Sequence, residues 1–197
     1  MPAAVFSLDR LKPFVAAASL IVLAGCAAMN PSPGKRELIV VGNDEKVNFS
    51  DAGAFVFLAP GKDTVSIIDI GTDPLAPRIL VNLPLMNSIF GPPVNLAIRP
   101  DQSLALVANS MDWQQDGAGW KPGFDNKLYV IDLAANPPAL IDTVTVGKQP
   151  SGMSINRAGN LALITNRPDN SICRLPLAGQ KVALIDTVAM GGRGTPG

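Results

Sequence analysis

The chain contains no histidine among its 197 residues. Histidine is the general base in Ser-His-Asp and Cys-His catalysis, a ligand in most zinc sites and an axial ligand of haem. These chemistries are therefore excluded. Covalent haem attachment is excluded as well, because no Cys-x-x-Cys-His motif occurs. We predict no catalytic residue, no metal site and no cofactor.

Cysteine and net charge are scarce too. Cys26 and Cys173 are the two cysteines, and no imidazole is available to activate Cys173, which we predict to be a packing or surface thiol. Lys and Arg balance Asp and Glu at 16 each, so the formal net charge is zero. Because a protein that binds nucleic acid needs a basic face, we predict no nucleic-acid partner.

Helical periodicity is missing from residues 38–189, where short apolar segments alternate with turn residues. LALVAN at 104–109 recurs as LALITN at 161–166, and LIDTVTVGKQP at 140–150 recurs 44 positions later as LIDTVAMGGRG. A repeat of this length fits a four-stranded propeller blade, which has about 40–45 residues. We therefore predict an all-β fold, a partial β-propeller over 38–197. Its three four-stranded antiparallel blades are expected at about 38–83, 94–146 and 151–189.

The first repeat unit matches the other two less closely. Its four strands are expected at 38–42, 54–59, 64–70 and 76–83. Because side chains alternate between the two faces of a strand, every second residue should enter the core between blades. The apolar positions expected to be buried include Leu106, Val130, Ile141, Ile155, Leu163 and Ile185.

LALVAN, LALITN, the Val-Gly-x-x-Pro segment at 146–150 and the Ile-Asp pairs that close strands together resemble the YVTN β-propeller repeat family. That family belongs to a wider group of lactonase-like and nitrite-reductase-like propellers. The resemblance implies a ring of about seven blades, which is within the usual range for propellers. Two explanations of a sequence with three repeats stay open. The chain is a truncated or frameshifted member, or it associates with other chains to complete a ring.

The N-terminal segment carries a second signal. Arg10 and Lys12 precede an apolar run at 14–25, which is shorter than the ~20 residues that span a bilayer core and is typical of a secretory signal. The run ends in Leu-Ala-Gly-Cys, which resembles the bacterial lipobox, in which the cysteine sulfur is lipidated. An ordinary secretory signal with a chance cysteine, or an uncleaved anchor, are the alternatives.

From this signal we predict a lipoprotein signal peptide at 1–25, lipidation at Cys26 and a flexible tether at 26–37. The protein would then be exported and lipid-anchored to the cell envelope. In a Gram-negative host it would lie on the outer-membrane or periplasmic side. With Cys26 lipidated, Cys173 would have no partner for an intrachain disulfide.

Residues 110–126 interrupt the repeat and carry both tryptophans. In a four-stranded meander the second-to-third-strand connections and the links between blades emerge at one end, so this inserted loop should lie near 84–93. Aromatic residues exposed on a rigid scaffold suit recognition. The alternative is that the tryptophans pin their own loop against the blade. The candidate ligand- or partner-binding residues are Trp113, Trp120, Phe124, Phe90, Asn109 and Asn166.

Two functional hypotheses from different classes follow. The first is a non-catalytic binding or scaffold lipoprotein. Its lipid anchor would hold it to the membrane, and its partner would be an envelope protein or a small ligand. The second is a propeller enzyme, such as a lactonase-like hydrolase, with catalytic residues in blades that this sequence lacks. The sequence leaves enzymatic activity open and favours the non-catalytic interpretation.

Overall fold

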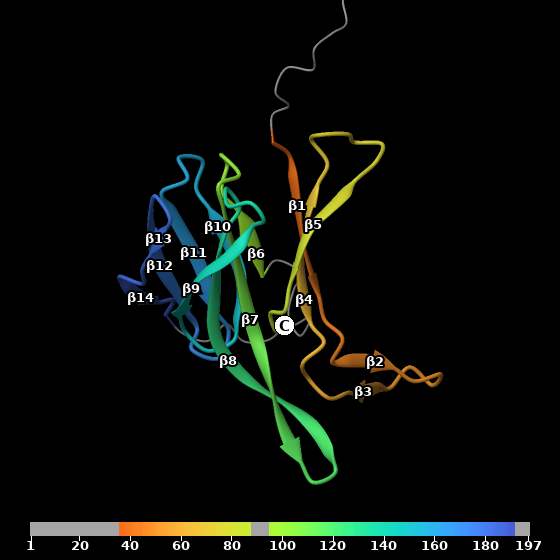
Figure 1. Cartoon of the computed structure of the whole chain (residues 1–197). Coiled ribbons are helices and arrows are strands. Elements are labelled where there is room, and N and C mark those ends of the chain that lie inside the picture. The colour runs from red at the N-terminus through yellow and green to blue at the C-terminus, as the bar shows by residue number, and fades with distance from the viewer. Residues whose placement is uncertain (1–35, 88–94, 192–197) are drawn as a thin grey trace, which may run out of the picture. The chain divides into compact units, whose positions relative to one another are not determined.

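The computed structural model describes residues 36–87 and 95–191, and these form strands joined by turns (Figure 1). The chain divides into two units, Met1–Ser32 and Pro33–Gly197, and every described residue belongs to the second. The predicted signal peptide, Cys26 and Phe90 lie outside the described residues. The described part has no helix that is long and apolar enough to cross a membrane.

The second and third repeats each fold into an antiparallel sheet. The second sheet runs in chain order through β6 (Leu96–Ile98), β7 (Leu104–Asp116), β8 (Gly119–Asp132) and β9 (Ala139–Thr145). The third sheet contains β10 (Pro150–Ile155), β11 (Leu161–Asn166), β12 (Ser171–Ala178), β13 (Lys181–Val182) and β14 (Asp186–Ala189). Its main order is β10-β11-β12-β14, and β13 pairs with the end of β12. The predicted all-β fold of antiparallel blades is confirmed.

The first sheet differs from the expected strand assignment. It consists of β1 (Leu38–Asn43), β4 (Thr64–Asp69) and β5 (Arg78–Leu83), whereas β2 (Val47–Phe49) and β3 (Phe55–Phe57) form a separate hairpin. The expected strand at 54–59 is therefore wrong as a member of the blade. β1 instead occupies the second-strand position of the blade. No strand pairs with its other edge among the described residues, so the first-strand position is empty there.

The register shows that β1 is a third copy of the repeated strand. Leu38 pairs with Asp69 and Asn43 with Thr64, just as Leu104 pairs with Asp132 at the start of β7. LIVVGN thus corresponds to LALVAN and LALITN. The β2–β3 hairpin is inserted directly after β1 and lengthens the spacing between β1 and β4. The spacing therefore differs from that of the other repeats, and the match of β1 was not detected in the sequence.

The predicted loop at 110–126 is instead a continuation of the sheet. β7 and β8 stay paired from Leu104 with Asp132 to Asp116 with Gly119, with a bulge between Asn109 and Met111. Gly117 closes the tip at a φ of 60°, a left-handed conformation that glycine adopts without a steric penalty. The insertion is therefore a projecting two-stranded ribbon, visible in green in Figure 1.

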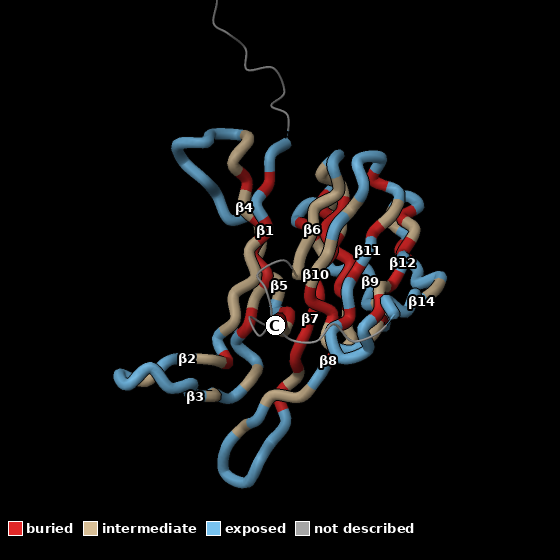
Figure 2. Tube along the Cα trace, turned by 180° about the vertical axis from the view of Figure 1, so that it is seen from behind, coloured by how far each residue is buried: buried red, intermediate tan, exposed pale blue. Residues whose placement is uncertain are grey.

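The core lies in two layers on either side of the second sheet (Figure 2). Along β7, Leu104, Leu106 and Ala108 face the third sheet, and Ala105 and Val107 face the first. Both faces of the middle blade are therefore buried. The alternation predicted from the sequence is present, and Leu106 and Val130 are fully buried as expected.

Three of the other expected core positions are wrong. Leu163 is 41% exposed, Ile141 43% and Ile185 60%. Leu163 occupies the same repeat position as Leu106, but it lies on the outer face of the third sheet, against which no described sheet packs. Ile155 is partly buried against the core. The repeat thus sets the direction of each side chain, and the neighbouring blade decides whether that side chain is covered.

Candidate functional site

Buried polar side chains gather at one end of the sheets. We call it the connection end, and it comprises the ends of β1, β7 and β11, the connections that follow them, and residues 84–87 and 146–151. A buried polar group without a hydrogen-bond partner is unfavourable, so polar side chains that gather inside a protein are usually held by specific hydrogen bonds. The buried polar residues at this end are Lys46, Asp63, Asn87, Asn109, Ser110, Asp125, Ser151, Asn166 and Ser171.

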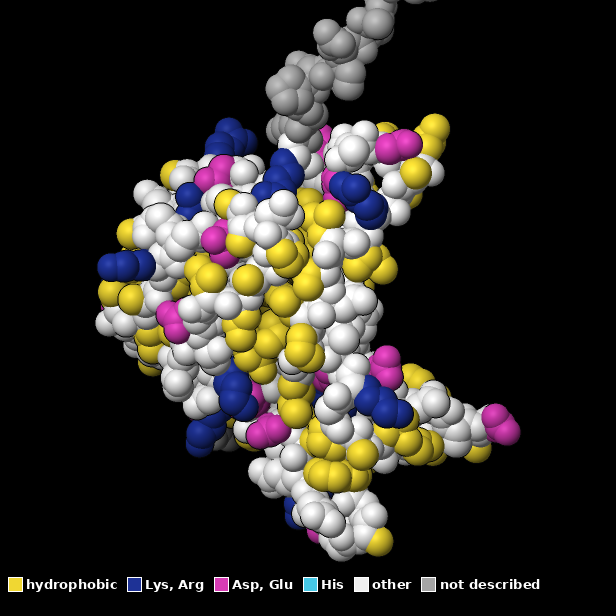
Figure 3. All heavy atoms as spheres, in the orientation of Figure 1, with side chains coloured by type: hydrophobic (Ala, Val, Ile, Leu, Met, Phe, Trp, Pro, Cys, Tyr) yellow, Lys and Arg dark blue, Asp and Glu magenta, His cyan; other side chains and the backbone are white. Residues whose placement is uncertain are grey.

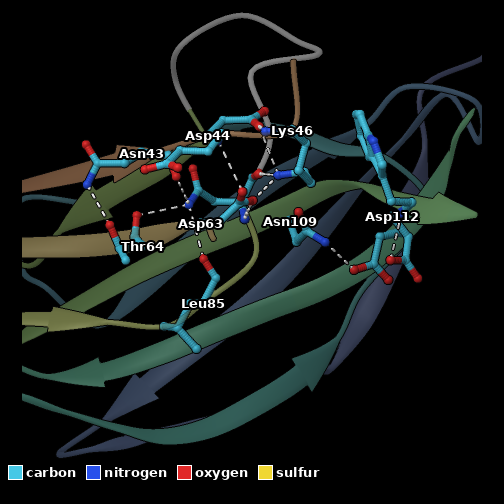
Figure 4. Close-up of polar contacts among 12 residues, drawn as sticks. Asn43, Asp44, Lys46, Asp63, Thr64, Leu85, Asn109 and Asp112 are labelled. Atoms are coloured by element: carbon cyan, nitrogen blue, oxygen red, sulfur yellow. Dashed lines mark hydrogen bonds and ion pairs between the residues drawn. The ribbon is translucent and has the colours of Figure 1, made fainter. Parts of the chain in front are cut away.

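Lys46 is the most unusual residue of the connection end, because its side chain is only 1% exposed. Its ammonium group donates to Asp63 Oδ2 and to the backbone carbonyl of Asn87. Asp44 Oδ1 lies 3.0 Å from the same nitrogen, and the centroid of the Trp113 ring lies 5.2 Å from it. Figure 4 shows Asp44, Lys46 and Asp63 close together, in the connections between β1 and β2 and between β3 and β4.

The carboxylate of Asp63 is held in place by the backbone. The N–H of Glu45 donates to Asp63 Oδ1 over 3.2 Å, and the N–H of Asn87 donates to Asp63 Oδ2 over 3.1 Å. The Asn87 amide donates in turn to the carbonyls of Asn43 and Thr64. The base of the β2–β3 hairpin, the start of β4 and the segment after β5 are therefore tied together at one point.

Burial lowers the pKa of Lys46 below its ordinary value, because the charged form loses its hydration. The hydrogen bond and charge of Asp44 and the charge of Asp112 act in the opposite direction without cancelling the effect of burial. At a given pH, a larger fraction of Lys46 is therefore in the neutral amine form than is the case for a surface lysine. The sequence contained no periodic or motif-like sign of this cluster, which depends on contacts between residues far apart in the chain.

The two predicted asparagines end the repeated strands and are both buried. The Asn109 amide donates to Asp125 Oδ2 over 2.6 Å, and Lys127 Nζ lies 3.0 Å from the same oxygen. The Asn166 amide donates to Ser171 Oγ over 3.1 Å and to Cys173 Sγ over 3.2 Å. Both asparagines accordingly brace the strand that starts after the connection.

Gly147 shows how closely the blades approach at Asn166. A Cβ atom at Gly147 would lie 2.3 Å from Asn166 Cγ, so only glycine fits between the blades here. This contact gives the Val-Gly-x-x-Pro segment, noted in the sequence, a physical reason. The connection between the second and third blades passes directly over the end of β11.

The predicted aromatic residues divide into a buried and an exposed group. Trp113 is 6% exposed and meets Phe57 edge-on, with 5.9 Å between ring centroids, so it pins the β7–β8 ribbon beside the β2–β3 hairpin. Trp120 is half-buried, and Phe124 is 56% exposed. Trp113 therefore holds the ribbon against the β2–β3 hairpin, whereas the alternative considered from the sequence placed both tryptophans against the blade.

The aromatic residues on the β2–β3 hairpin are not among those predicted from the sequence. Phe49 is 58% exposed and Phe55 55%, and their ring centroids are 5.1 Å apart. Phe57 stacks on Phe55 with 6.4 Å between centroids. The alternating Phe-Val-Phe at 55–57 was the signal available. Figure 3 shows hydrophobic side chains over the two projecting hairpins.

Acid–base chemistry at the connection end is limited in the described residues. Burial raises the pKa of Tyr129 to about 12, and the negative charges of Asp125 and Asp112 add to the effect. The Tyr129 phenol is therefore protonated at physiological pH. In the part of the chain that the structure describes, no group of His, Cys, Asp or Glu side chains is arranged to hold a metal ion.

Comparison with known proteins adds to this description. No family model matches the chain, and no curated protein matches it. Among solved structures it is similar to a periplasmic gluconolactonase of Pseudomonas aeruginosa, at 18% identity and a TM-score of 0.45. It is also similar to a proposed 6-phosphogluconolactonase of Bacteroides uniformis, at 13% identity and a TM-score of 0.43.

These similarities are partial in length. They cover 81% and 78% of this chain, but the chain spans only 41% of the Pseudomonas protein and 54% of the Bacteroides protein. At such scores and identities the likeness carries no argument about activity. The assignment of antiparallel propeller-type blades rests on the sheets themselves.

Proposed function

We propose that the chain is a non-catalytic binding module of the cell envelope, which recognises a partner protein through the exposed phenylalanines at its connection end. The observation that carries the proposal is the pair Phe49 and Phe55, which are more than half exposed on a projecting hairpin. Phe124, on the neighbouring ribbon, adds to this aromatic surface. Exposed aromatic side chains of this kind are enriched at protein–protein interfaces.

The hairpin is also well supported from beneath. Phe57, from the same hairpin, stacks on Phe55 and meets Trp113, and Trp113 in turn covers the buried Lys46. A side chain held in this way loses little conformational freedom on binding, so more of its buried area appears as affinity. The β2–β3 hairpin projects from the first sheet (Figure 1), and exposed rings on a projecting hairpin favour a protein partner over a small ligand, which is usually bound in a concave pocket.

Catalysis is disfavoured by the state of the reactive side chains in the described part. Lys46 and Asp63 are buried and already bonded to each other and to backbone groups. Asn109 and Asn166 have their amide nitrogens bonded within the blades. A general acid or base must reach the substrate proton to act on it, and none of these groups is exposed to do so.

The partner interaction is tested by cross-linking in a bacterial host that expresses the full chain. A photoreactive residue at Ala52, exposed in the turn of the β2–β3 hairpin, should capture a partner. Phe55→Ala should reduce the captured product at least tenfold. Leu75→Ala is the matched control, because Leu75 is 95% exposed at the opposite end of the first sheet and should have no effect. Equal loss in both variants would contradict the proposal.

A hydrolase assay separates this function from the alternative enzyme. The purified chain is incubated with a panel of aliphatic and sugar lactones, and acid release is followed in a pH-stat. We expect no release above the rate of the Lys46→Arg and Asp63→Asn variants. Release that these substitutions abolish and Phe55→Ala leaves intact would favour the lactonase-like hypothesis.

Export and lipidation at Cys26 belong to the same proposal and rest on the Leu-Ala-Gly-Cys context after an apolar run. Metabolic labelling with a fatty-acid analogue should mark the wild-type chain. Cys26→Ser should lose the label and leave the membrane fraction, whereas Cys173→Ser should keep both. Incorporation of the fatty-acid analogue into Cys26→Ser would contradict lipidation at Cys26.

A further inference from the structure

An amine and a carboxyl group lie in direct contact inside the connection end. Lys46 Nζ contacts Asp63 Oδ2, and their side chains are 1% and 2% exposed. A second carboxyl group, that of Asp44, lies 3.0 Å from the same nitrogen and is fully buried. The aromatic ring of Trp113 covers the group from one side.

We propose that Lys46 and Asp63 form an intramolecular isopeptide bond, with Asp44 as the acid–base catalyst that moves the protons. This would be a covalent modification site, and it goes beyond the proposed binding function. Nucleophile, electrophile and proton carrier are all within contact range in a site closed to water. Because folding has already brought the reacting groups together, the entropy cost of doing so is absent from the reaction barrier.

The reaction starts from the neutral pair, an amine on Lys46 and a protonated carboxyl on Asp63, which one proton transfer makes from the ion pair. Lys46 Nζ attacks Asp63 Cγ, and a C–N bond forms. Asp44 takes a proton from the nitrogen and delivers it to the hydroxyl at Oδ2. The C–O bond breaks, one water molecule leaves, and Asp44 is a carboxylate again. No oxidant or reductant is needed.

The surrounding backbone groups suit both the intermediate and the product. The N–H of Glu45 already donates to Asp63 Oδ1, where negative charge develops in the tetrahedral intermediate. In the product, Oδ1 is the amide oxygen and keeps this hydrogen bond. The one hydrogen left on the nitrogen is donated to the carbonyl of Asn87, the acceptor that Lys46 already uses.

Burial also favours the amide over the ion pair. The unreacted cluster holds one buried cation beside the carboxylates of Asp44 and Asp63, and separating such charges from water is unfavourable. Condensation removes one positive and one negative charge and leaves a neutral amide whose polar atoms are bonded. Burial of Lys46 lowers its pKa, which increases the fraction of amine able to attack.

The decisive experiment is mass spectrometry of the full chain. The wild type should weigh one water molecule less than the mass calculated for its processed form, and Lys46→Arg and Asp63→Ala should each have the mass calculated for that form. Trypsin should not cleave after Lys46, and the peptide containing Lys46 should stay joined to the peptide that begins at Asp63. Fragment spectra that show Asp63 as a free amino terminus distinguish this branched product from an undigested linear peptide.

Two further variants test the chemistry. Asp63→Asn should form the same bond with loss of one ammonia molecule. Asp44→Asn should have the mass calculated for its processed form, because no group is left to move the protons. Wild-type protein at full mass overturns the proposal, and so does a loss of water that persists in Lys46→Arg. Peptide mapping of the wild type is decisive even where a variant fails to fold.

Discussion

β7 and β11 contain nearly the same six residues at 104–109 and 161–166, yet their surroundings differ. Leu106 in β7 is fully buried between two sheets, and Leu163 in β11 is 41% exposed on an outer face. After Asn109 the chain continues into a long ribbon, and after Asn166 it turns back within four residues. The repeat therefore fixes strand and register, whereas the neighbouring blade fixes burial and the connection supplies the chemistry.

The largest expected effect distinguishes the buried Lys46–Asp63 pair, in the connections of the first sheet, from an exposed ion pair in the third sheet. Lys46→Ala leaves Asp63 and Asp44 buried without Lys46, their partner in the ion pair or in the proposed amide, so it should lower the free energy of unfolding by about 3 to 5 kcal/mol. Arg174→Ala removes the exposed ion pair with Asp186 between β12 and β14 and should change stability little. Urea unfolding followed by tryptophan fluorescence gives both values. Similar losses of unfolding free energy in the two variants would show that the buried Lys46 cluster contributes no more to stability than an exposed ion pair.

The next prediction compares the same repeat position in two blades. Leu106→Ala opens a cavity in a core covered on both faces and should destabilise the protein by about 2 to 5 kcal/mol. Leu163→Ala removes a partly exposed side chain and should cost less than about 1 kcal/mol. Thermal melts of the two variants make the comparison directly. An equal loss at Leu163 would mean that the outer face of the third blade is covered in solution.

A smaller effect is expected where the blades approach each other. Gly147→Ala brings a methyl group against Asn166, and the resulting shift should cost about 1 to 3 kcal/mol. Gly117→Ala at the ribbon tip meets no atom within 4 Å and should cost about 1 to 2 kcal/mol, for its positive φ alone. Chemical denaturation should rank Gly147→Ala as the more harmful. The reverse order would contradict the close contact at Asn166.

The smallest effect concerns the turn that precedes each repeated strand. Asp101 accepts hydrogen bonds from Ser103 and Arg99, which hold the pKa of its carboxyl at about 2, below its ordinary 3.8. A depressed pKa contributes stability above the ordinary value, and that contribution is lost as the pH falls toward about 2. In the third blade the neutral Asn156 holds the corresponding turn.

Asp101→Asn should therefore flatten the fall in melting temperature between pH 4 and pH 2 and slightly lower the melting temperature at pH 7, because the variant lacks the stability that the charged carboxyl contributes there. Asn156→Asp should introduce the same acid sensitivity into the third turn. The measurement is a series of thermal melts over that pH range. A slope that is the same in wild type and Asp101→Asn would assign the acid sensitivity to other carboxyl groups.

These differences explain which parts could be predicted from the sequence. LALVAN and LALITN identified their strands because local sequence and spacing agree. LIVVGN was not identified as a third copy, since the β2–β3 hairpin displaced the strand that follows it. The exposure of Leu163 depends on what lies beside the third sheet, which no local pattern encodes. Lys46 and Asp63 meet through the folding of two connections, so neither residue stood out on its own.

The edge of the first sheet has a consequence for assembly. β1 is paired on one side with β4, and its other edge has no strand partner in the described part of the chain. Gln102 accepts a hydrogen bond from the Leu38 N–H at one end of this strand, and the Asn87 side chain lies against Gly42 near the other. An open strand edge can pair with a strand of another copy of the chain, and many sheets prevent such pairing with charged residues or proline. Concentration-dependent self-association through β1 would therefore be the expected cost of this edge.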